Sequence, residues 1–271
     1  MSKINETQKN IDMGNHGEDY GNWMSNAVLY FMLGIIAVLA VVSVTFFTVL
    51  DIIGLGILFA IFCLGVVCFI LYAYWVRRRY SYDGGRKMDE VHQVILTNLD
   101  FDGQGSLLDV GCGSGALGIR AALTWPDAKI LGVDNWGVMY SYSKKVCEEN
   151  IQKAGVTDRC SVQNGDAQKL DFADETFDAV VSNYVYHNLG GRRGQELVLE
   201  TLRVLKKGGV FAINDSMRPK MYGDVEEFAQ KLRDMGYSDV CLVDTGTLIF
   251  GSQKMAKKMF LEDSMMICGR K

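Results

Sequence analysis

Two long apolar runs open the chain, ahead of a regular alternation of short apolar runs and amphipathic stretches. Residues 27–50 and 57–76 contain no charged side chain. Each run is long enough to cross a hydrocarbon core of about 30 Å, which takes about 20 apolar residues. Between the runs lie Asp51 and two glycines, which permit a tight turn. The pattern therefore predicts a helical hairpin over residues 27–76 that crosses a membrane and returns.

Basic residues predict the orientation of this hairpin. Five Lys or Arg residues lie within residues 77–87, directly after the second run, whereas the turn between the runs has none. Because basic residues favour the cytoplasmic side, we expect both the N-terminal tail (residues 1–26) and the large C-terminal part in the cytoplasm. Three other interpretations stay open: a cleaved signal peptide, a buried hairpin of a soluble protein, and a re-entrant hairpin that enters one leaflet.

The pattern of apolar and amphipathic stretches over residues 105–271 predicts one α/β domain. Residues 77–104 are expected to form a linker and lid. Strands that alternate with helices are typical of a parallel sheet covered on both faces, which is a doubly wound fold. Apolar runs predict strands at 106–111, 128–134, 160–164, 177–182, 209–214, 240–244 and 264–269, and amphipathic stretches predict helices at 116–125, 138–154, 195–205 and 222–235.

Composition narrows the function classes. The 271 residues carry a net charge of −4, so no basic excess indicates a nucleic-acid partner. The seven cysteines have no C-x-x-C spacing and are odd in number. We therefore expect scattered, reduced thiols of a cytoplasmic domain and no disulfide framework. The three histidines are far apart in sequence, so no metal site is predicted.

The first strand-to-helix turn carries the strongest chemical signal. It places Gly111, Gly113 and Gly115 at alternate positions, where glycine lets the backbone turn sharply and approach a ligand closely. The next predicted strand ends at Asp134, whose carboxylate can accept both hydroxyls of a ribose. The sequence therefore predicts a nucleoside-containing cofactor at the carboxyl edge of the sheet.

The identity of the cofactor depends on Asp109. Residues 113–118 also fit the Gly-x-Gly-x-x-Gly dinucleotide fingerprint, which leaves a nicotinamide-dependent oxidoreductase as an alternative. A carboxylate two residues before Gly111 repels a pyrophosphate and suits a cofactor with a cationic end, such as a sulfonium amino acid.

Four ordered motifs over about residues 105–215 resemble class I S-adenosylmethionine-dependent methyltransferases. This resemblance implies a seven-stranded sheet whose last strand is antiparallel, with S-adenosylmethionine as the cofactor. The motifs are residues 107–119 (LLDVGCGSGALGI), 130–134 (ILGVD), 164–167 (NGDA) and 177–189 (FDAVVSNYVYHNL), and residues 205–211 (LKKGGVF) resemble the turn before the fifth strand.

The resemblance implies a role for each motif residue. Asp109 and the turn of Gly111, Cys112, Gly113 and Gly115 would hold the methionine end of the cofactor. Asp134 would take the ribose hydroxyls, and Asn135 or Trp136 would pack on the adenine. Gly165, Asp166 and Ala167 would meet the adenine edge, and Ser182 and Asn183 would lie beside the methyl group that is transferred.

The turn after the fourth predicted strand should face the methyl acceptor. It lacks the Asn/Asp-Pro-Pro-Tyr form that methylases of base or glutamine amide nitrogens carry, so it resembles enzymes of small molecules. His187 is the candidate general base and Tyr184 the candidate catalytic or pocket residue. The alternatives are a histidine that caps a helix and a tyrosine that only packs.

The expected protein is thus a two-pass, membrane-anchored methyltransferase of a small or lipid-soluble acceptor, with no nucleic-acid partner and with oligomers possible. Two alternatives beside the oxidoreductase stay open: a membrane-bound sensor that binds S-adenosylmethionine without catalysis, and a protein methyltransferase. The acceptor atom is left open among O, S, N and C.

Overall fold

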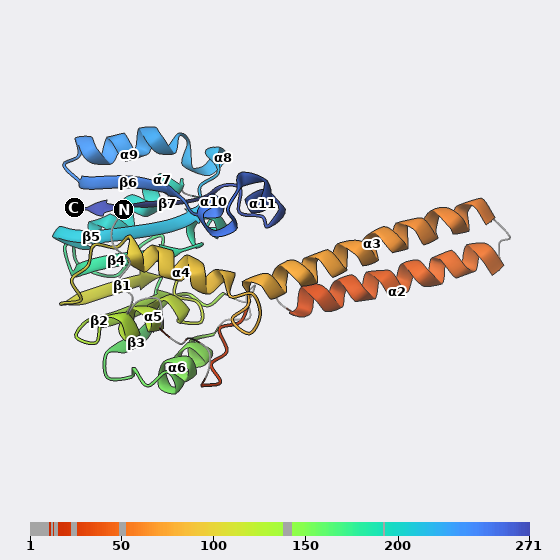
Figure 1. Cartoon of the computed structure of the whole chain (residues 1–271), viewed down its shortest axis with the longest axis horizontal. Helices are drawn as coiled ribbons and strands as arrows, with labels where there is room; N and C mark the ends of the chain where they lie inside the picture. Colours follow the sequence, from red (N-terminus) through yellow and green to blue (C-terminus); the bar gives the residue numbers. More distant parts are fainter. Residues whose placement is uncertain are drawn as a thin grey trace. The chain divides into compact units, whose positions relative to one another are not determined.

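The computed structural model describes residues 11, 13, 16–22, 26–48, 53–137, 143–191 and 193–271. The chain divides into two compact units (Figure 1). The hairpin unit is Gly21–Arg86. The sheet unit contains the N-terminal residues through Tyr20 together with Lys87–Val138 and Tyr142–Lys271.

The hairpin unit consists of two apolar helices, α2 (Asn26–Thr48) and α3 (Ile53–Tyr80). Both are long and apolar enough to cross a membrane, with mean hydropathies of 2.5 and 2.9, and only 6% of each span is buried. The turn predicted between the two runs, residues 51–56, extends too far, because Gly54 and Gly56 already lie within α3. Asp51 lies outside the described residues.

Small side chains let α2 and α3 approach closely. A Cβ atom on Gly56 would lie 2.8 Å from the ring of Phe47, so only glycine fits there. Ser43 donates from its hydroxyl to the carbonyl oxygen of Gly56 at 3.1 Å, and the rings of Phe46 and Phe59 stack at 5.3 Å. Close contact between small residues is typical of helix pairs in membranes.

The segment that follows α3 is a compact turn. The amide of Gly85 donates to the Arg78 carbonyl at 2.8 Å, and the amide of Arg86 donates to the Ser81 carbonyl at 2.9 Å. Residues 81–86 therefore close the end of α3 and belong to the hairpin unit. The lid predicted over residues 77–104 is divided, because Lys87 begins α4 (Lys87–Thr97) in the sheet unit.

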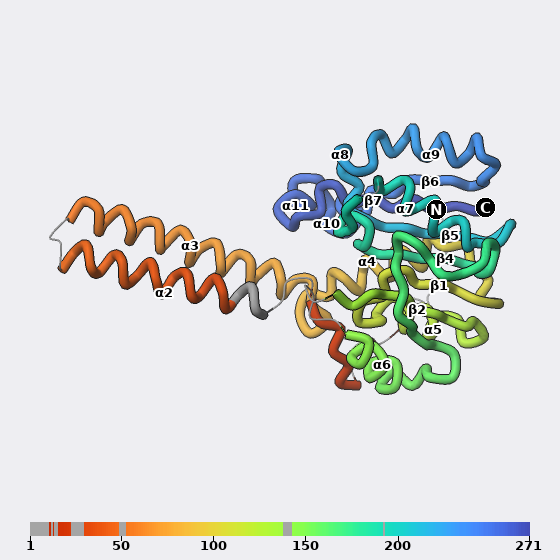
Figure 2. Tube along the Cα trace, turned by 180° about the vertical axis from the view of Figure 1, so that it is seen from behind, coloured from red at the N-terminus to blue at the C-terminus, as the bar shows by residue number. Residues whose placement is uncertain are grey.

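The sheet unit is built on seven strands in the order β3-β2-β1-β4-β5-β7-β6 (Figures 1 and 2). All neighbours up to β5 are parallel, and β7 is antiparallel to both β5 and β6, which confirms the predicted doubly wound fold. The strands are β1 (Ser106–Val110), β2 (Lys129–Asp134), β3 (Cys160–Asn164), β4 (Phe177–Asn183), β5 (Leu205–Ser216), β6 (Ser238–Asp244) and β7 (Ser264–Arg270).

Helices cover the sheet on both sides. In the two views α4 and α5 lie on one face and α7 on the other (Figures 1 and 2). β4 and β5 are buried on both faces by this cover, as their apolar residues require. The remaining elements are α5 (Ala116–Thr124), α6 (Lys144–Lys153), η1 (Tyr186–Asn188), α7 (Gly194–Arg203), α8 (Pro219–Tyr222), α9 (Val225–Asp234), α10 (Thr245–Phe250) and α11 (Gln253–Lys258).

Two sequence expectations near β5 and α6 differ from the structure. The helix predicted over residues 195–205 ends at Arg203, and the strand predicted from residue 209 is β5, which already begins at Leu205. The helix expected from residue 138 is α6, which begins at Lys144, and residues 138–142 lie outside the described part of the chain.

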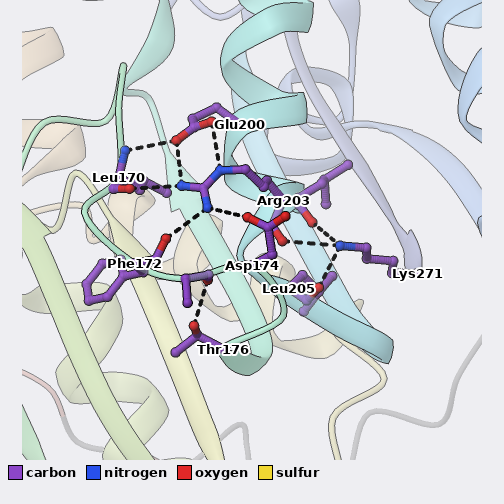
Figure 3. A network of polar contacts seen from close by, with 10 residues as sticks. Leu170, Phe172, Asp174, Thr176, Glu200, Arg203, Leu205 and Lys271 are labelled. Atoms are coloured by element: carbon purple, nitrogen blue, oxygen red, sulfur yellow. Dashed lines mark hydrogen bonds and ion pairs between the residues drawn. The ribbon is translucent and has the colours of Figure 1, made fainter.

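Arg203 holds the loop between β3 and β4 (Figure 3). Its guanidinium donates to the carbonyl oxygens of Leu170 and Phe172 at 2.9 and 2.8 Å, and it pairs with Glu200 and Asp174. Lys271 donates to the carbonyl oxygens of Leu202, Arg203 and Leu205 near the end of α7. The contacts of Arg203 hold residues 170–174 of this loop against α7.

The expectation that all seven cysteines are reduced is wrong for two of them. Cys241 and Cys268 form a disulfide between β6 and β7. The antiparallel register places these two residues directly opposite each other, with their Cα atoms 5.4 Å apart. Their separation of 27 residues carried no sequence signal, because the pairing is created by the strand register alone.

Candidate active site

Polar residues gather at the carboxyl edge of the parallel strands. The strand register aligns Val110 at the end of β1 with Val133 on one side and Ser182 on the other. The same register pairs Asp134 with Asn164, and Asn183 with Asn214. The turns that follow these strands therefore open on one edge of the sheet, where α/β proteins bind their ligands.

Three glycines shape the turn after β1. Gly111, Gly113 and Gly115 all have positive φ, at 72°, 53° and 84°, a region that residues with a Cβ atom rarely adopt. A Cβ atom on Gly111 would lie 2.2 Å from Val185, so the turn packs directly against the segment after β4. The glycines thus bring the backbone of the first turn beside the turn after β4, which is predicted to face the methyl acceptor.

Asp134 fastens the turn from the end of β2. One carboxylate oxygen accepts the amide of Gly113 at 2.9 Å, and the other accepts the amide of Trp136 at 2.7 Å. Trp136 adopts a positive φ of 43° and donates from its indole nitrogen to the Gly113 carbonyl at 2.9 Å. Asp134 and Trp136 are therefore brought to the glycine turn as predicted, while Asn135 is exposed beside them.

Asp109 lies beneath the turn. It is 1% exposed, and its Oδ2 atom has no hydrogen-bond partner among the described residues. Burial raises the pKa of the carboxyl group to about 7, although the amide of Gly118 opposes this shift. The predicted repulsion of a pyrophosphate by Asp109 therefore acts in full only above that pH.

Cys112 packs under the same turn. It is 8% exposed, and a hydrogen bond with Cys147 together with burial raises the pKa of its thiol well above the usual value. A thiol held in its neutral form serves as a small apolar group, so Cys112 supports the turn rather than reacting.

The predicted adenine-side residues follow β3. Gly165 donates its amide to the Asp134 carbonyl at 3.0 Å, and a Cβ atom at Gly165 would lie 3.3 Å from Val133. Asp166 is exposed and accepts the amide of Gln168 at 2.8 Å, which forms a local turn. Ala167 packs against the core. These residues lie next to Asp134 on the same edge of the sheet.

The two predicted residues at the end of β4 differ in role. Ser182 is 0% exposed, and its hydroxyl donates to the Val110 carbonyl at 2.9 Å, so it joins β4 to β1. Asn183 is half-buried and lies at the edge. Its Oδ1 accepts from Asn214 at 2.9 Å, and its Nδ2 lies 3.0 Å from the Nε2 of His92 on α4.

Tyr184 and Tyr186 both bind other side chains. The Tyr184 hydroxyl lies 2.6 Å from the Ser264 hydroxyl, which in turn lies 2.7 Å from that of Thr245. Burial raises the pKa of Tyr184 to about 12, so its hydroxyl keeps its proton at neutral pH. Tyr186 is fully buried and bonds Thr201 at 2.6 Å, which makes it a packing residue.

His187 pairs with a carboxylate that the sequence interpretation missed. Its Nδ1 lies 2.5 Å from Oδ1 of Asp215, and its backbone amide donates to Oδ2 of Asp215 at 2.9 Å. Tyr222 donates its hydroxyl to the same Oδ2 at 2.5 Å. Asp215 is 0% exposed, whereas the His187 side chain is 28% exposed.

This arrangement fixes the histidine tautomer. A carboxylate only accepts hydrogen bonds, so Nδ1 of His187 carries the proton and Nε2 of the neutral ring carries a lone pair. A histidine oriented in this way by a buried carboxylate can take a proton from a substrate. Asp215 was detectable in principle, because it lies at the end of the fifth predicted strand, where the same edge rule applies.

The comparisons with known proteins agree with this geometry. A family model described as a methyltransferase domain matches residues 102–260, which is more than half of the chain. A sterol 4-C-methyltransferase of Caenorhabditis elegans is 28% identical over 159 residues, covering 57% of this chain and 45% of that protein. A 27-O-demethylrifamycin SV methyltransferase of Amycolatopsis mediterranei is 31% identical over 140 residues, with coverages of 51% and 48%.

Solved structures share the fold at low identity. A geranyl diphosphate C-methyltransferase from Streptomyces coelicolor superposes with a TM-score of 0.52 at 14% identity, covering 69% of this chain and 80% of that one. The [4+2]-cyclase SpnF gives a TM-score of 0.53 at 19% identity, with coverages of 68% and 81%. The matched part of this chain spans about half the length of the curated relatives.

Proposed function

The chain belongs to the methyltransferase domain family, whose class I members use S-adenosylmethionine, and from this premise we propose a membrane-anchored methyltransferase of a lipid-soluble small molecule. The observation that carries the proposal is the contact between the glycine turn and the turn after β4, where Gly111 meets Val185, two residues from His187. This proximity supports a cofactor cradle next to a base.

The cofactor side fits S-adenosylmethionine. Gly111, Gly113 and Gly115 give the turn its positive φ angles, Asp134 lies beside it with two carboxylate oxygens, and Oδ2 of the buried Asp109 has no hydrogen-bond partner among the described residues. We propose that Asp134 accepts the ribose hydroxyls, that Trp136 and Asp166 contact the adenine, and that Asp109 acts on the cofactor through its charge beneath the turn. The bound cofactor supplies a methyl group on a sulfonium sulfur, which is already activated for displacement.

The acceptor side supplies a base. We propose that Nε2 of His187 takes the proton that the acceptor loses as its bond to the methyl group forms, and that Asp215 stabilises the resulting imidazolium. Asn183 and Tyr184 would border the acceptor. An acceptor with an acidic O–H, N–H or C–H group uses this base, whereas a thioether does not need one.

The hairpin supports a lipid-soluble acceptor. The side chains of α2 and α3 that the structure describes are largely apolar and exposed, for example Phe31 at 71% and Leu64 at 64%. Water does not stabilise such a surface, and a bilayer does. We infer that this surface lies in a bilayer, where a lipid-soluble acceptor is dissolved.

Two observations bear on the topology. The basic residues Arg77–Arg79 in the last turn of α3 favour a cytoplasmic sheet unit. The disulfide between Cys241 and Cys268 is of a kind more often found in oxidising compartments. We follow the basic residues and propose two passes with both termini in the cytoplasm. A membrane-impermeant reagent should then label epitope tags placed before His16 or after Lys271 only when the cells are permeabilised. Labelling of these tags on intact cells would show the opposite orientation.

The function is tested with the full chain in nanodiscs that contain a total lipid extract. S-adenosylmethionine labelled in its methyl group is added, and lipid and aqueous fractions are profiled for label. We expect label in the lipid fraction, and an initial rate of labelling at least about a hundredfold lower with the His187→Ala variant. Labelled product confined to soluble acceptors would contradict the lipid-soluble substrate. Cofactor binding without product in either fraction would favour the sensor.

A further inference from the structure

The residues just before the hairpin lie on the sheet unit beside the glycine turn. Tyr20 is 5% exposed and Met13 is 1% exposed, so both side chains are buried although the local chain has no regular secondary structure. Burial raises the pKa of Tyr20, and the charges of Glu18 and Asp89 raise it further. Asp89 lies on α4, so the Tyr20 ring is inserted near that helix. We call residues 16–20 the N-terminal strap.

One buried side chain, Asn150 on α6, joins this strap to the glycine turn. Asn150 is 0% exposed, and its Oδ1 accepts the amide of Asp19 at 2.8 Å. Its Nδ2 donates to the Asp19 carbonyl at 2.8 Å and to the Ser114 carbonyl at 2.9 Å. The side-chain amide of Asn150 therefore accepts a hydrogen bond from the strap and donates one to it. It also donates to the backbone of Ser114, between Gly113 and Gly115.

A second contact closes the same link. The Ser114 hydroxyl donates to the Tyr20 carbonyl at 2.9 Å and is buried. Lys153, one turn after Asn150 on α6, donates to the Gly17 carbonyl at 2.7 Å, but this contact is exposed and does not involve the turn. The strap is thus bound to the glycine turn at Ser114 and to α6 at two further positions.

We propose that Asn150 is a positioning residue for cofactor binding, and that the N-terminal strap is part of the cofactor site. The glycine turn consists of residues with high backbone freedom, so its bound conformation carries a large entropy cost unless neighbouring groups hold it. Asn150 holds it from below through Ser114, and the strap completes the hold. Whatever stabilises the docked strap thereby strengthens cofactor binding.

This coupling is reciprocal by thermodynamic necessity. If the docked strap favours the cofactor, the bound cofactor must favour the docked strap to the same extent. The amide of Asp19 reports on docking directly, because its hydrogen bond to Asn150 protects it from exchange. We therefore expect S-adenosylmethionine to slow hydrogen exchange in a peptide that covers residues 16–22.

The test measures S-adenosylmethionine affinity by calorimetry on the full chain in nanodiscs. We expect Asn150→Ala to weaken binding about tenfold or more, because it removes the bonds to Ser114 and to both sides of Asp19. In turnover assays the same variant should raise the KM for S-adenosylmethionine and leave kcat and the acceptor KM nearly unchanged. A residue that merely supports folding would not produce this split.

Two further variants keep the inference testable if Asn150→Ala folds poorly. Ser114→Ala removes the Tyr20 contact alone, and we expect a smaller loss of affinity together with faster exchange in residues 16–22. Lys145→Ala is the matched control on the same helix, because Lys145 is exposed and pairs only with Glu149 in the contacts described, and its affinity is expected within twofold of the wild type. Equal affinity in wild type, Asn150→Ala and Ser114→Ala, or exchange at residues 16–22 that ignores the cofactor, would overturn the inference. The inference rests on cofactor binding, so absence of binding in the wild type would instead contradict the proposed function.

Discussion

The two halves of the sheet edge are built in different ways. On the cofactor half, after β1 to β3, the ligand-facing groups are mostly backbone atoms of glycines held by nearby residues, such as Gly113 and Asp134, 21 positions apart. On the proposed acceptor half, at the ends of β4, β5 and β6 and the start of β7, the edge is a network of side chains. There Tyr184 bonds Ser264, 80 positions away, and Asn183 meets His92, 91 positions away.

This difference explains what each half can do. A backbone cradle recognises one cofactor and tolerates few changes, because glycine at positive φ has no substitute. A side-chain network is assembled from residues on several elements, so it can change its substrate while the cradle stays the same. Variants of the cofactor half should therefore alter binding of S-adenosylmethionine, and variants of the acceptor half should alter turnover.

The largest effect is expected from Asp134→Ala on the cofactor half. The change removes the acceptor for the Gly113 and Trp136 amides and, in our proposal, for both ribose hydroxyls. Hydrogen bonds to a charged group contribute about 1.5–3 kcal/mol each, so the loss of the two bonds to the ribose should lower the affinity for S-adenosylmethionine about a hundred- to ten-thousandfold. Calorimetry measures this loss, with the exposed Asp127→Ala as control. Retained affinity in Asp134→Ala would remove this carboxylate from the cofactor site.

The next effect is expected from His187→Ala and Asp215→Asn on the acceptor half. Loss of a general base costs about a hundred- to ten-thousandfold in rate. We expect kcat to fall within this range in both variants while the affinity for S-adenosylmethionine changes less than twofold. The exposed His16→Ala is the control. Unchanged turnover in either variant would remove the pair from the mechanism, and a parallel loss of cofactor affinity would break the division between the halves.

A third effect is a difference between the two halves in how folding stability depends on pH. Burial lowers the pKa of His92 from 6.5 to about 4, with Asp89 opposing this shift and Arg120 adding to it. The unfolded chain binds a proton between these values and the folded chain does not, so stability is full above about 6.5 and is lost as pH falls towards 4. The difference corresponds to about 3 kcal/mol.

Thermal unfolding between pH 7 and 4 measures this contribution. His92→Gln keeps an acceptor for Asn183 but does not titrate, so its stability should decline less over this window than that of the wild type. His16→Gln, at an exposed site, should follow the wild type. Asp109 on the cofactor half acts in the opposite sense, because its raised pKa makes it most stabilising below about 4 and least stabilising above about 7. Identical slopes for the wild type and His92→Gln would show that His92 is not the group that titrates.

The smallest effect is expected from Tyr222→Phe. This change removes one hydroxyl that donates to Asp215 and leaves the His187 contact in place. We expect kcat to fall about tenfold or less, with cofactor affinity unchanged. A loss as large as that of Asp215→Asn would mean that Tyr222 itself contacts the acceptor.

Sequence reasoning was most successful where structure is local. Glycines at alternate positions after an apolar run identified the turn after β1, and strand-end Asp134 was found by its distance along the chain. The seven strands and the antiparallel last strand followed from the resemblance and are confirmed by the register. The glycine turn and Asp134 lie within one βαβ unit.

The long-range contacts of the fold and of the candidate site could not be predicted from the sequence, for a physical reason. The Asn183–His92 contact and the Cys241–Cys268 bond each join residues that only the tertiary fold brings together, and Asp215 meets His187 only because β4 and β5 pair side by side. Asn150 looked like an ordinary helix residue, because its partners in the N-terminal strap are 131 positions away. Side-chain contacts of this kind produce no recognisable spacing of residues along the sequence.

The most direct test of the central claim is a calorimetric titration of the full chain in nanodiscs with S-adenosylmethionine and, separately, with a nicotinamide dinucleotide. We predict saturable heat with the sulfonium cofactor that disappears in Asp134→Ala, and no heat with the dinucleotide. Saturable binding of the dinucleotide without any binding of S-adenosylmethionine would contradict the account.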